Sequence, residues 1–83
     1  MKLGTLQGHT SWVLDLSIIP NGQYMASASN DKTVKIWDLE THENIATIQQ
    51  HTDTVWGVDW NSDGTKLVSS GADNTLIIYN CVF

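Results

Sequence analysis

The chain consists of two similar halves that follow each other without a gap. A shift of the sequence by 42 residues places His9 on His51. The same shift places Thr10 on Thr52 and Gly22 on Gly64. The same shift aligns further identical pairs: Val13 with Val55, Ser27 with Ser69, Asp31 with Asp73, Thr33 with Thr75 and Ile36 with Ile78. A repeat at this spacing indicates that each unit is one supersecondary structure, which buries its apolar surface against its neighbours.

Turn residues separate short β-prone runs in both halves. Asn21-Gly22 and Asp63-Gly64 are pairs that supply the positive φ angles of tight hairpins, and Asn30-Asp31 and Asp73-Asn74 mark further turns. The runs between the turns predict strands at residues 2–6, 12–18, 23–29, 33–38, 44–49, 54–60, 65–71 and 75–80. Repeats of about 40–45 residues with four strands each are typical of β-propeller blades. The sequence therefore predicts an all-β partial propeller of two four-stranded antiparallel blades, with repeat units at residues 1–41 and 42–83.

The apolar pattern of the first long strand in each half slips by one residue. Val13, Leu16 and Ile18 in the first half, like Val55, Val58 and Trp60 in the second, do not keep the period of two that a regular strand requires. The slip predicts a β-bulge near Leu14-Asp15 and another near Trp56-Gly57. The alternative is a regular strand with one stray residue.

These motifs resemble the WD-repeat (WD40) family over almost the whole chain. The resemblance rests in the first repeat on the following residues: Gly8-His9, Val13, Leu16, Ile18, Pro20-Asn21-Gly22, Ser27, Asp31 and Trp37-Asp38. The second repeat departs from the pattern, because Gln50 stands before His51, Tyr79 replaces the Trp, and Asn80 replaces the final Asp. Within the family, Ser11–Leu14, His51–Val58 and Ile77–Cys81 resemble the last two repeats of a member that serves RNA-decay and transcription-elongation assemblies.

The resemblance implies a structural hydrogen-bond network in each repeat. In the first repeat it comprises His9, Ser27, Asp31 and Trp37, and in the second His51, Ser69, Asp73 and Tyr79. A neutral His accepts from a Ser and donates to an Asp, while the Trp indole donates to the Ser. Because a tyrosine carries its polar atom elsewhere than an indole, we expect Tyr79 to make a weaker or water-bridged link to Ser69.

Two chemical readings of the same residues compete with the structural one. His9, Ser27 and Asp31 together have the composition of a hydrolase triad, but such a site also needs an exposed nucleophile, an oxyanion hole and a pocket. The trio occurs twice at identical spacing, which favours a structural unit. Metal binding by His9, His42 and His51 is disfavoured, since each network has one His and His42 lies in a predicted exposed turn. We therefore expect no enzyme activity, no metal and no cofactor.

In this family the partner-facing positions flank the first Val of each repeat and precede the turn Asp. The resemblance therefore implies that partners bind at these residues: Trp12, Leu14 and Asn30 in the first repeat, and Thr54, Trp56 and Ala72 in the second. Aromatic anchors of this kind are enriched in protein interfaces. The alternative is that Trp12 or Trp56 packs into a neighbouring blade. The implied partners are helicase and scaffold subunits of a multiprotein complex in the cytoplasm and nucleus.

Composition narrows the choice of partners. The net charge is −5, with four basic and nine acidic residues, which argues against direct binding to nucleic acid or to an anionic membrane. No apolar run approaches the ~20 residues of a membrane-spanning helix. Residues Met1–Leu6 lack the apolar core of a signal peptide. A single cysteine, Cys81, excludes an intrachain disulfide, so we expect an intracellular, reducing environment.

Two blades do not close a ring, because propellers have about four to eight. Residues Lys2–Leu6 have the pattern of an outer strand and precede the first blade, so we expect them to complete another one. Three explanations remain open. The chain is the C-terminal piece of a longer propeller, it self-associates into a closed ring of three or four copies, or it docks onto another protein's incomplete sheet. Bare sheet faces of this kind mark association sites.

Overall fold

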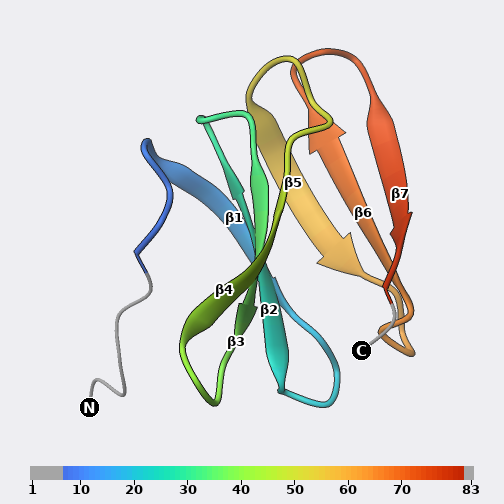
Figure 1. The fold of residues 1–83 in the computed structure, drawn as a ribbon. Helices are drawn as coiled ribbons and strands as arrows, with labels where there is room; N and C mark the ends of the chain where they lie inside the picture. The colour runs from blue at the N-terminus through green and yellow to red at the C-terminus, as the bar shows by residue number, and fades with distance from the viewer. Residues whose placement is uncertain (1–6, 82–83) are drawn as a thin grey trace.

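A computed structural model describes residues 7–81 and contains two antiparallel sheets (Figure 1). The first sheet holds β1 (Val13–Ile18), β2 (Tyr24–Ser29), β3 (Val34–Asp38) and β4 (Glu43–Ile48), in that order. The second holds β5 (Val55–Trp60), β6 (Lys66–Gly71) and β7 (Leu76–Asn80), also in sequence order. Among residues 7–81 there is no helix long and apolar enough to cross a membrane.

The hairpin turns follow from residues that tolerate a positive φ angle. Gly22, between β1 and β2, has a φ of 77°, and Gly64, between β5 and β6, has a φ of 74°. The amide of each glycine donates to the carbonyl three residues earlier, at Ile19 and at Asn61. The Asn-Gly and Asp-Gly signals of the sequence therefore set the two turns as predicted.

Seven of the eight predicted strands are confirmed, each to within about one residue at either end. The eighth, at residues 2–6, lies outside the described residues. Both predicted bulges are also confirmed, because the register shifts between Val13 and Asp15 and between Val55 and Gly57. A third bulge was not predicted. It lies in β4, where Ile36 pairs with Ala46 but Trp37 pairs with Asn44.

The first sheet takes its fourth strand from the second repeat. β4 follows the end of the first repeat in the sequence, yet it pairs with β3 along the outer edge of the first sheet. The second sheet has three strands within residues 7–81. The sequence repeat and the sheet are thus offset from each other by one strand.

The two sheets pack face to face, with β5 against β1 and β2 (Figure 1). The core between them contains aliphatic side chains and the indole of Trp60. Its buried members are Ile19, Ala26, Ala28, Val34, Ile36, Val55, Val58, Trp60 and Leu67. Trp60 also donates from Nε1 to the Ser17 carbonyl oxygen at 3.0 Å, which joins the sheets by a hydrogen bond as well as by apolar contact.

Candidate interaction surface

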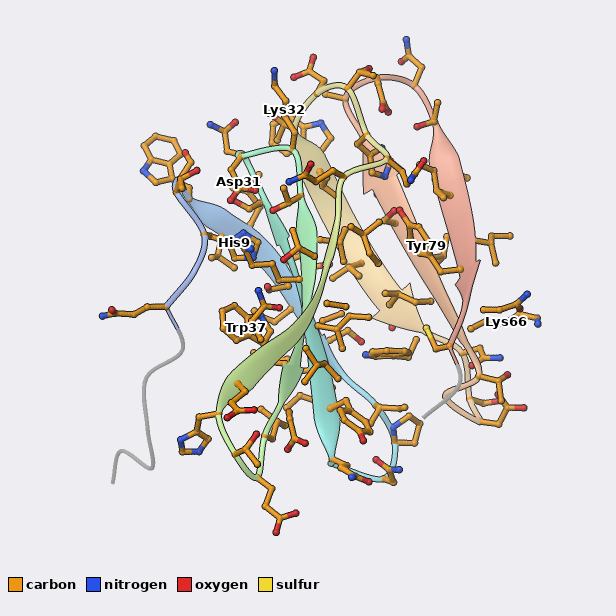
Figure 2. The ribbon with its side chains drawn as sticks, viewed as in Figure 1. His9, Asp31, Lys32, Trp37, Lys66 and Tyr79 are labelled. Carbon is orange, nitrogen blue, oxygen red and sulfur yellow. The ribbon has the colours of Figure 1, made fainter. Side chains whose placement is uncertain are left out.

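A chain of hydrogen bonds crosses the first sheet from β3 to the loop before β1. Trp37 Nε1 donates to Ser27 Oγ at 2.8 Å, and His9 Nε2 lies 2.6 Å from the same oxygen. His9 Nδ1 lies 2.8 Å from Asp31 Oδ2. Figure 2 shows Asp31, His9 and Trp37 following one another along this sheet. The network ties the loop that carries His9 to the turn that carries Asp31.

The donors and acceptors of this chain determine the tautomer of His9. The ionised Asp31 carboxylate only accepts, so in a neutral His9 ring the proton lies on Nδ1, and the Ser27 hydroxyl, which accepts from the Trp37 indole, donates to Nε2. Nε2 is then the acceptor, and Nδ1 carries the proton that is donated to Asp31. All four side chains are satisfied by this arrangement, and within residues 7–81 no buried side-chain polar atom lacks a partner.

Asp31 gathers further donors at the turn between β2 and β3. Its carboxylate accepts from the amide and hydroxyl of Thr33 and from the Thr10 amide, which donates at 3.1 Å. Burial alone would raise the pKa of this carboxyl, but the bonds from Thr33, His9 and Thr10 outweigh it and lower the pKa from 3.8 to about 2. The turn is therefore fixed by an ionised group at neutral pH.

The second network repeats the first at the same sequence separations. His51 Nε2 lies 2.7 Å from Ser69 Oγ, and His51 Nδ1 lies 3.0 Å from Asp73 Oδ2. Hydrogen bonds from Thr75 and from the Thr52 amide hold the pKa of Asp73 well below its ordinary value, against a smaller opposing effect of burial.

Tyr79 corrects one expectation. Its hydroxyl lies 3.0 Å from Ser69 Oγ, so the prediction of a weaker or water-bridged link was wrong. The phenol reaches the serine directly and takes the place of the indole, because its ring projects the hydroxyl far enough along the same face. Burial raises the pKa of Tyr79, which keeps the phenol protonated and able to donate to Ser69.

Replacing Tyr79 with phenylalanine tests this bond. We expect the free energy of unfolding to fall by about 0.5–1.5 kcal/mol, because one partly buried hydrogen bond is lost while the ring keeps its packing. Urea unfolding followed by circular dichroism measures the change. Tyr24→Phe is the matched control, since the Tyr24 hydroxyl accepts an exposed hydrogen bond from Gln23. Equal losses in the two variants would contradict a special role for Tyr79.

The depressed pKa of Asp31 predicts a loss of stability in acid. A carboxyl with a folded pKa of about 2 and an ordinary value of 3.8 stabilises the fold fully above about pH 4. This contribution is lost as the pH falls from about 4 to about 2, because the unfolded chain takes up the proton first. We expect urea midpoints to fall over this range, and to fall less in Asp31→Asn. An identical pH dependence in that variant would refute the assignment.

Four of the six predicted partner-facing residues are joined by hydrogen bonds at the ends of the sheets where the two networks lie. The Trp12 carbonyl accepts from the Asn30 amide at 2.9 Å and from Ser29 Oγ at 2.8 Å. Thr54 Oγ1 donates to Asn30 Oδ1 at 2.7 Å, and the Ala72 amide donates to the Thr54 carbonyl at 2.8 Å. We refer to the six predicted partner-facing residues as the rim: Trp12, Leu14, Asn30, Thr54, Trp56 and Ala72.

The members of the rim differ in exposure. Trp12 is 78% exposed and Trp56 is 58% exposed, so neither packs as core between the described blades. Leu14 is 36% exposed and Asn30 is also exposed. Thr54 is buried, and its hydroxyl is used to join the blades. The structure therefore corrects Thr54 from a surface position to part of the joint between the sheets.

The structure gives the catalytic and metal readings no support. Ser27 and Ser69 are 2% and 1% exposed, and each hydroxyl lies within hydrogen-bonding distance of two side chains. A serine nucleophile must meet its substrate, and these two do not reach the surface. Within residues 7–81, no group of three or more His, Cys, Asp or Glu side chains lies close enough to hold a metal ion.

Sequence comparison agrees with this arrangement of two repeated units. The family model for the WD domain, G-beta repeat, matches residues 1–38 and 42–80. A protein transport protein sec13 from Aspergillus oryzae is 42% identical over 81 residues, covering 90% of this chain and 28% of the relative. The protein transport protein SEC13 of Pyricularia oryzae is 36% identical over 83 residues, covering 92% of this chain and 29% of the relative. A ribosome biogenesis protein WDR12 homolog from Nematostella vectensis is 44% identical over 78 residues, covering 92% of this chain and 18% of the relative.

The fold and the repeated networks define a class of β-propeller blade proteins. The chain belongs to the WD40 repeat family. Repeats of this family generally mediate protein–protein interactions and typically act as non-enzymatic scaffolds. The chain spans less than a third of the length of each of these three relatives.

Proposed function

We propose that the chain is a non-enzymatic scaffold that binds segments of partner proteins at its rim. The observation that carries the proposal is the exposure of two large indoles, Trp12 and Trp56, on a frame held by two buried hydrogen-bond networks. Large aromatic side chains have few rotatable bonds and are enriched among interface anchors, and the networks hold the backbone that presents these two. Residues 1–41 and 42–83 are the two repeat units of this scaffold.

The rim also carries the polar groups that a peptide partner needs for orientation. Asn30 is exposed, and its Nδ2 donates to Ser11 Oγ at 3.2 Å, so a partner can compete for this contact. Ala72 contributes a small side chain to the rim. The acidic composition, with a net charge of −5, favours partner segments that carry basic residues.

Alanine substitution of the two indoles tests the proposed surface. We expect Trp12→Ala and Trp56→Ala each to weaken partner binding by about 2 kcal/mol, which is roughly a thirtyfold rise in Kd. Fluorescence anisotropy with a labelled partner segment measures the change. Ile45→Ala removes an exposed apolar side chain from the outer strand β4 and is expected to leave Kd unchanged. Unchanged binding in both tryptophan variants would remove the assignment of the rim.

For the assembly served, we propose that the chain is the C-terminal part of a propeller like the WD-repeat subunit of the superkiller complex. That assembly acts in RNA decay, and its WD-repeat subunit is also linked to the polymerase-associated factor complex of transcription elongation. The support is the likeness of Ser11–Leu14, His51–Val58 and Ile77–Cys81 to its last two repeats. The partners are then helicase and scaffold subunits in the cytoplasm and nucleus. Copurification of the chain with purified superkiller helicase and scaffold subunits, lost in Trp12→Ala, tests this assignment.

A further inference from the structure

The first hairpin turn of each sheet has the same backbone but a different side chain before its glycine. The β1–β2 turn contains Asn21-Gly22, and the β5–β6 turn contains Asp63-Gly64. The two glycines have φ angles of 77° and 74°, and both turns lie at the same end of the molecule (Figure 1). Each glycine amide donates to the carbonyl three residues earlier, at 2.8 Å to Ile19 and at 3.1 Å to Asn61. The two turns are therefore a matched pair in which the effect of the side chain can be compared.

Asn21 is the only asparagine of the chain that is followed by a glycine. The other five asparagines precede larger residues: Asp31, Ile45, Ser62, Thr75 and Cys81. A backbone nitrogen attacks the carboxamide of the preceding side chain most readily when its own residue has no side chain to hinder it. Asn21 is exposed, and a Cβ added at Gly22 would have no atom within 4 Å. The carboxamide and the nitrogen that can attack it are thus both accessible in this turn.

We propose that Asn21 is a site of spontaneous deamidation whose rate is set by the opening of the β1–β2 turn. The Gly22 amide nitrogen attacks Asn21 Cγ, and the Cγ–Nδ2 bond breaks. The proton of the attacking nitrogen leaves with the side-chain nitrogen as ammonia, and a five-membered succinimide remains. Water then opens this ring at one of its two carbonyl carbons. The reaction takes up water and releases ammonia, and nothing is oxidised or reduced.

The two directions of ring opening give products that fit the turn differently. Opening at Cγ gives an ordinary aspartate, and Asp63 shows that an aspartate fits this turn. Asp63 Oδ1 accepts from the Thr65 amide at 3.0 Å, just as Asn21 Oδ1 accepts from the Gln23 amide at 2.9 Å. Opening at the main-chain carbonyl gives isoaspartate, in which the backbone runs through Cβ and is one atom longer. The extra atom displaces the glycine amide from its acceptor, so isoaspartate is the product that breaks the turn.

The folded turn slows the reaction without preventing it. The Gly22 N–H proton must leave before the nitrogen can attack, and the Ile19 carbonyl holds this proton at 2.8 Å. Opening of the turn breaks this hydrogen bond and frees the nitrogen. The net strength of one hydrogen bond predicts that the folded chain reacts about two- to tenfold more slowly than the unfolded chain.

The second turn is protected by its chemistry and by its packing. Hydrogen bonds from Thr65 lower the pKa of Asp63, so its side chain is an ionised carboxylate at neutral pH and has no group that leaves as ammonia does. Gly64 is also covered, because a Cβ added there would lie 2.6 Å from Ile19 Cδ1. The same position at Gly22 is open. Substitution at Asp63 separates the two kinds of protection.

Ageing the purified chain in mildly alkaline buffer tests the proposal. Peptide mass spectrometry with electron-transfer fragmentation is expected to find aspartate and isoaspartate at position 21 before any change at the other asparagines. An equal amount of ammonia is released. The reaction is expected to be about two- to tenfold faster in urea. Gly22→Ala, compared in urea where folding plays no part, is expected to react more slowly, because its methyl group crowds the attacking nitrogen.

Two further variants test the fit of the product and the effect of packing. Asn21→Asp is expected to keep the circular dichroism spectrum and the urea midpoint of the unaltered chain, and to release no ammonia from this turn. Asp63→Asn places the same dipeptide in the covered turn. In urea it is expected to react there as fast as Asn21 does, because the two turns no longer differ. In the folded chain it is expected to react severalfold more slowly than Asn21, because Ile19 covers Gly64.

Four results would overturn the proposal. Asn21 could stay unmodified in urea while other asparagines react, or it could react equally fast in the folded and unfolded chains. Asp63→Asn could react as fast as Asn21 in the folded chain, which would remove the difference in packing. Asn21→Asp could lose structure, which would show that the aspartate product does not fit. None of these results bears on the rim, because the turn follows β1 whereas Trp12 precedes it.

Discussion

Replacing Trp60 with alanine is expected to lower the free energy of unfolding by about 3–5 kcal/mol. The indole is 8% exposed, belongs to the core between the sheets, and donates to the Ser17 carbonyl at 3.0 Å. Its removal leaves a cavity at the sheet contact and one carbonyl without its partner. Urea unfolding, followed by circular dichroism at equal protein concentration, measures the loss.

Trp12→Ala is the matched control for Trp60→Ala. Trp12 is 78% exposed, and its backbone carbonyl, which accepts from Ser29 and Asn30, is kept in the variant. The truncation is therefore expected to change stability by less than about 0.5 kcal/mol. Comparing the two variants separates the effect on stability of losing any indole from the effect of losing the contact between the sheets. If both variants lost the same stability, the contact between the sheets would not be what holds the chain together.

Replacing Ser27 with alanine is expected to cost about 2–4 kcal/mol. A single oxygen atom links Trp37 Nε1 at 2.8 Å and His9 Nε2 at 2.6 Å, and the site is 2% exposed. Its removal leaves the Trp37 indole N–H and His9 Nε2 without this partner. The cost of burying two unpaired polar groups is added to the loss of the two hydrogen bonds. The indole N–H proton of Trp37, observed by NMR, is expected to shift and to exchange faster with solvent.

Ser62→Ala is the control for Ser27→Ala, because Ser62 lies exposed in the turn between β5 and β6. We expect this variant to match the unaltered chain within about 0.5 kcal/mol. Ser69→Ala in the second repeat is expected to resemble Ser27→Ala, since it removes the oxygen that His51 and Tyr79 share. A loss at Ser27 as small as that at Ser62 would contradict a structural role for the network.

Much of the fold was predictable because the repeat supplies two independent copies of each signal. The turns at Gly22 and Gly64 require a positive φ angle, which few residue types tolerate, so the sequence marks them clearly. The bulges in β1 and β5 were visible as a slipped apolar pattern. The bulge in β4 has the same signal, since Ile45 and Ile48 are three residues apart and Leu3 and Leu6 repeat this spacing in the sequence, so it too could have been predicted.

The site was less predictable, because side-chain reach depends on the surroundings of each ring. Sequence position indicates that Tyr79 replaces an indole, but the 3.0 Å contact with Ser69 depends on how the ring tilts against its neighbours. The burial of Thr54 was hard to predict for the same reason. Its position in the repeat predicts an accessible residue, whereas its bond to Asn30 arises only from the way the two sheets meet.

The offset of β4 has a consequence for how such a gene can change in length. The junction between the two units is made by a strand encoded in the later unit, so a unit excised or duplicated together with its leading strand recreates the same pairing. The boundary of such a unit lies between Asp38 and Glu43, in the connection from β3 to β4. A boundary inside β4 would instead divide the strand that completes the first sheet, so viable recombination is expected to fall in the connection.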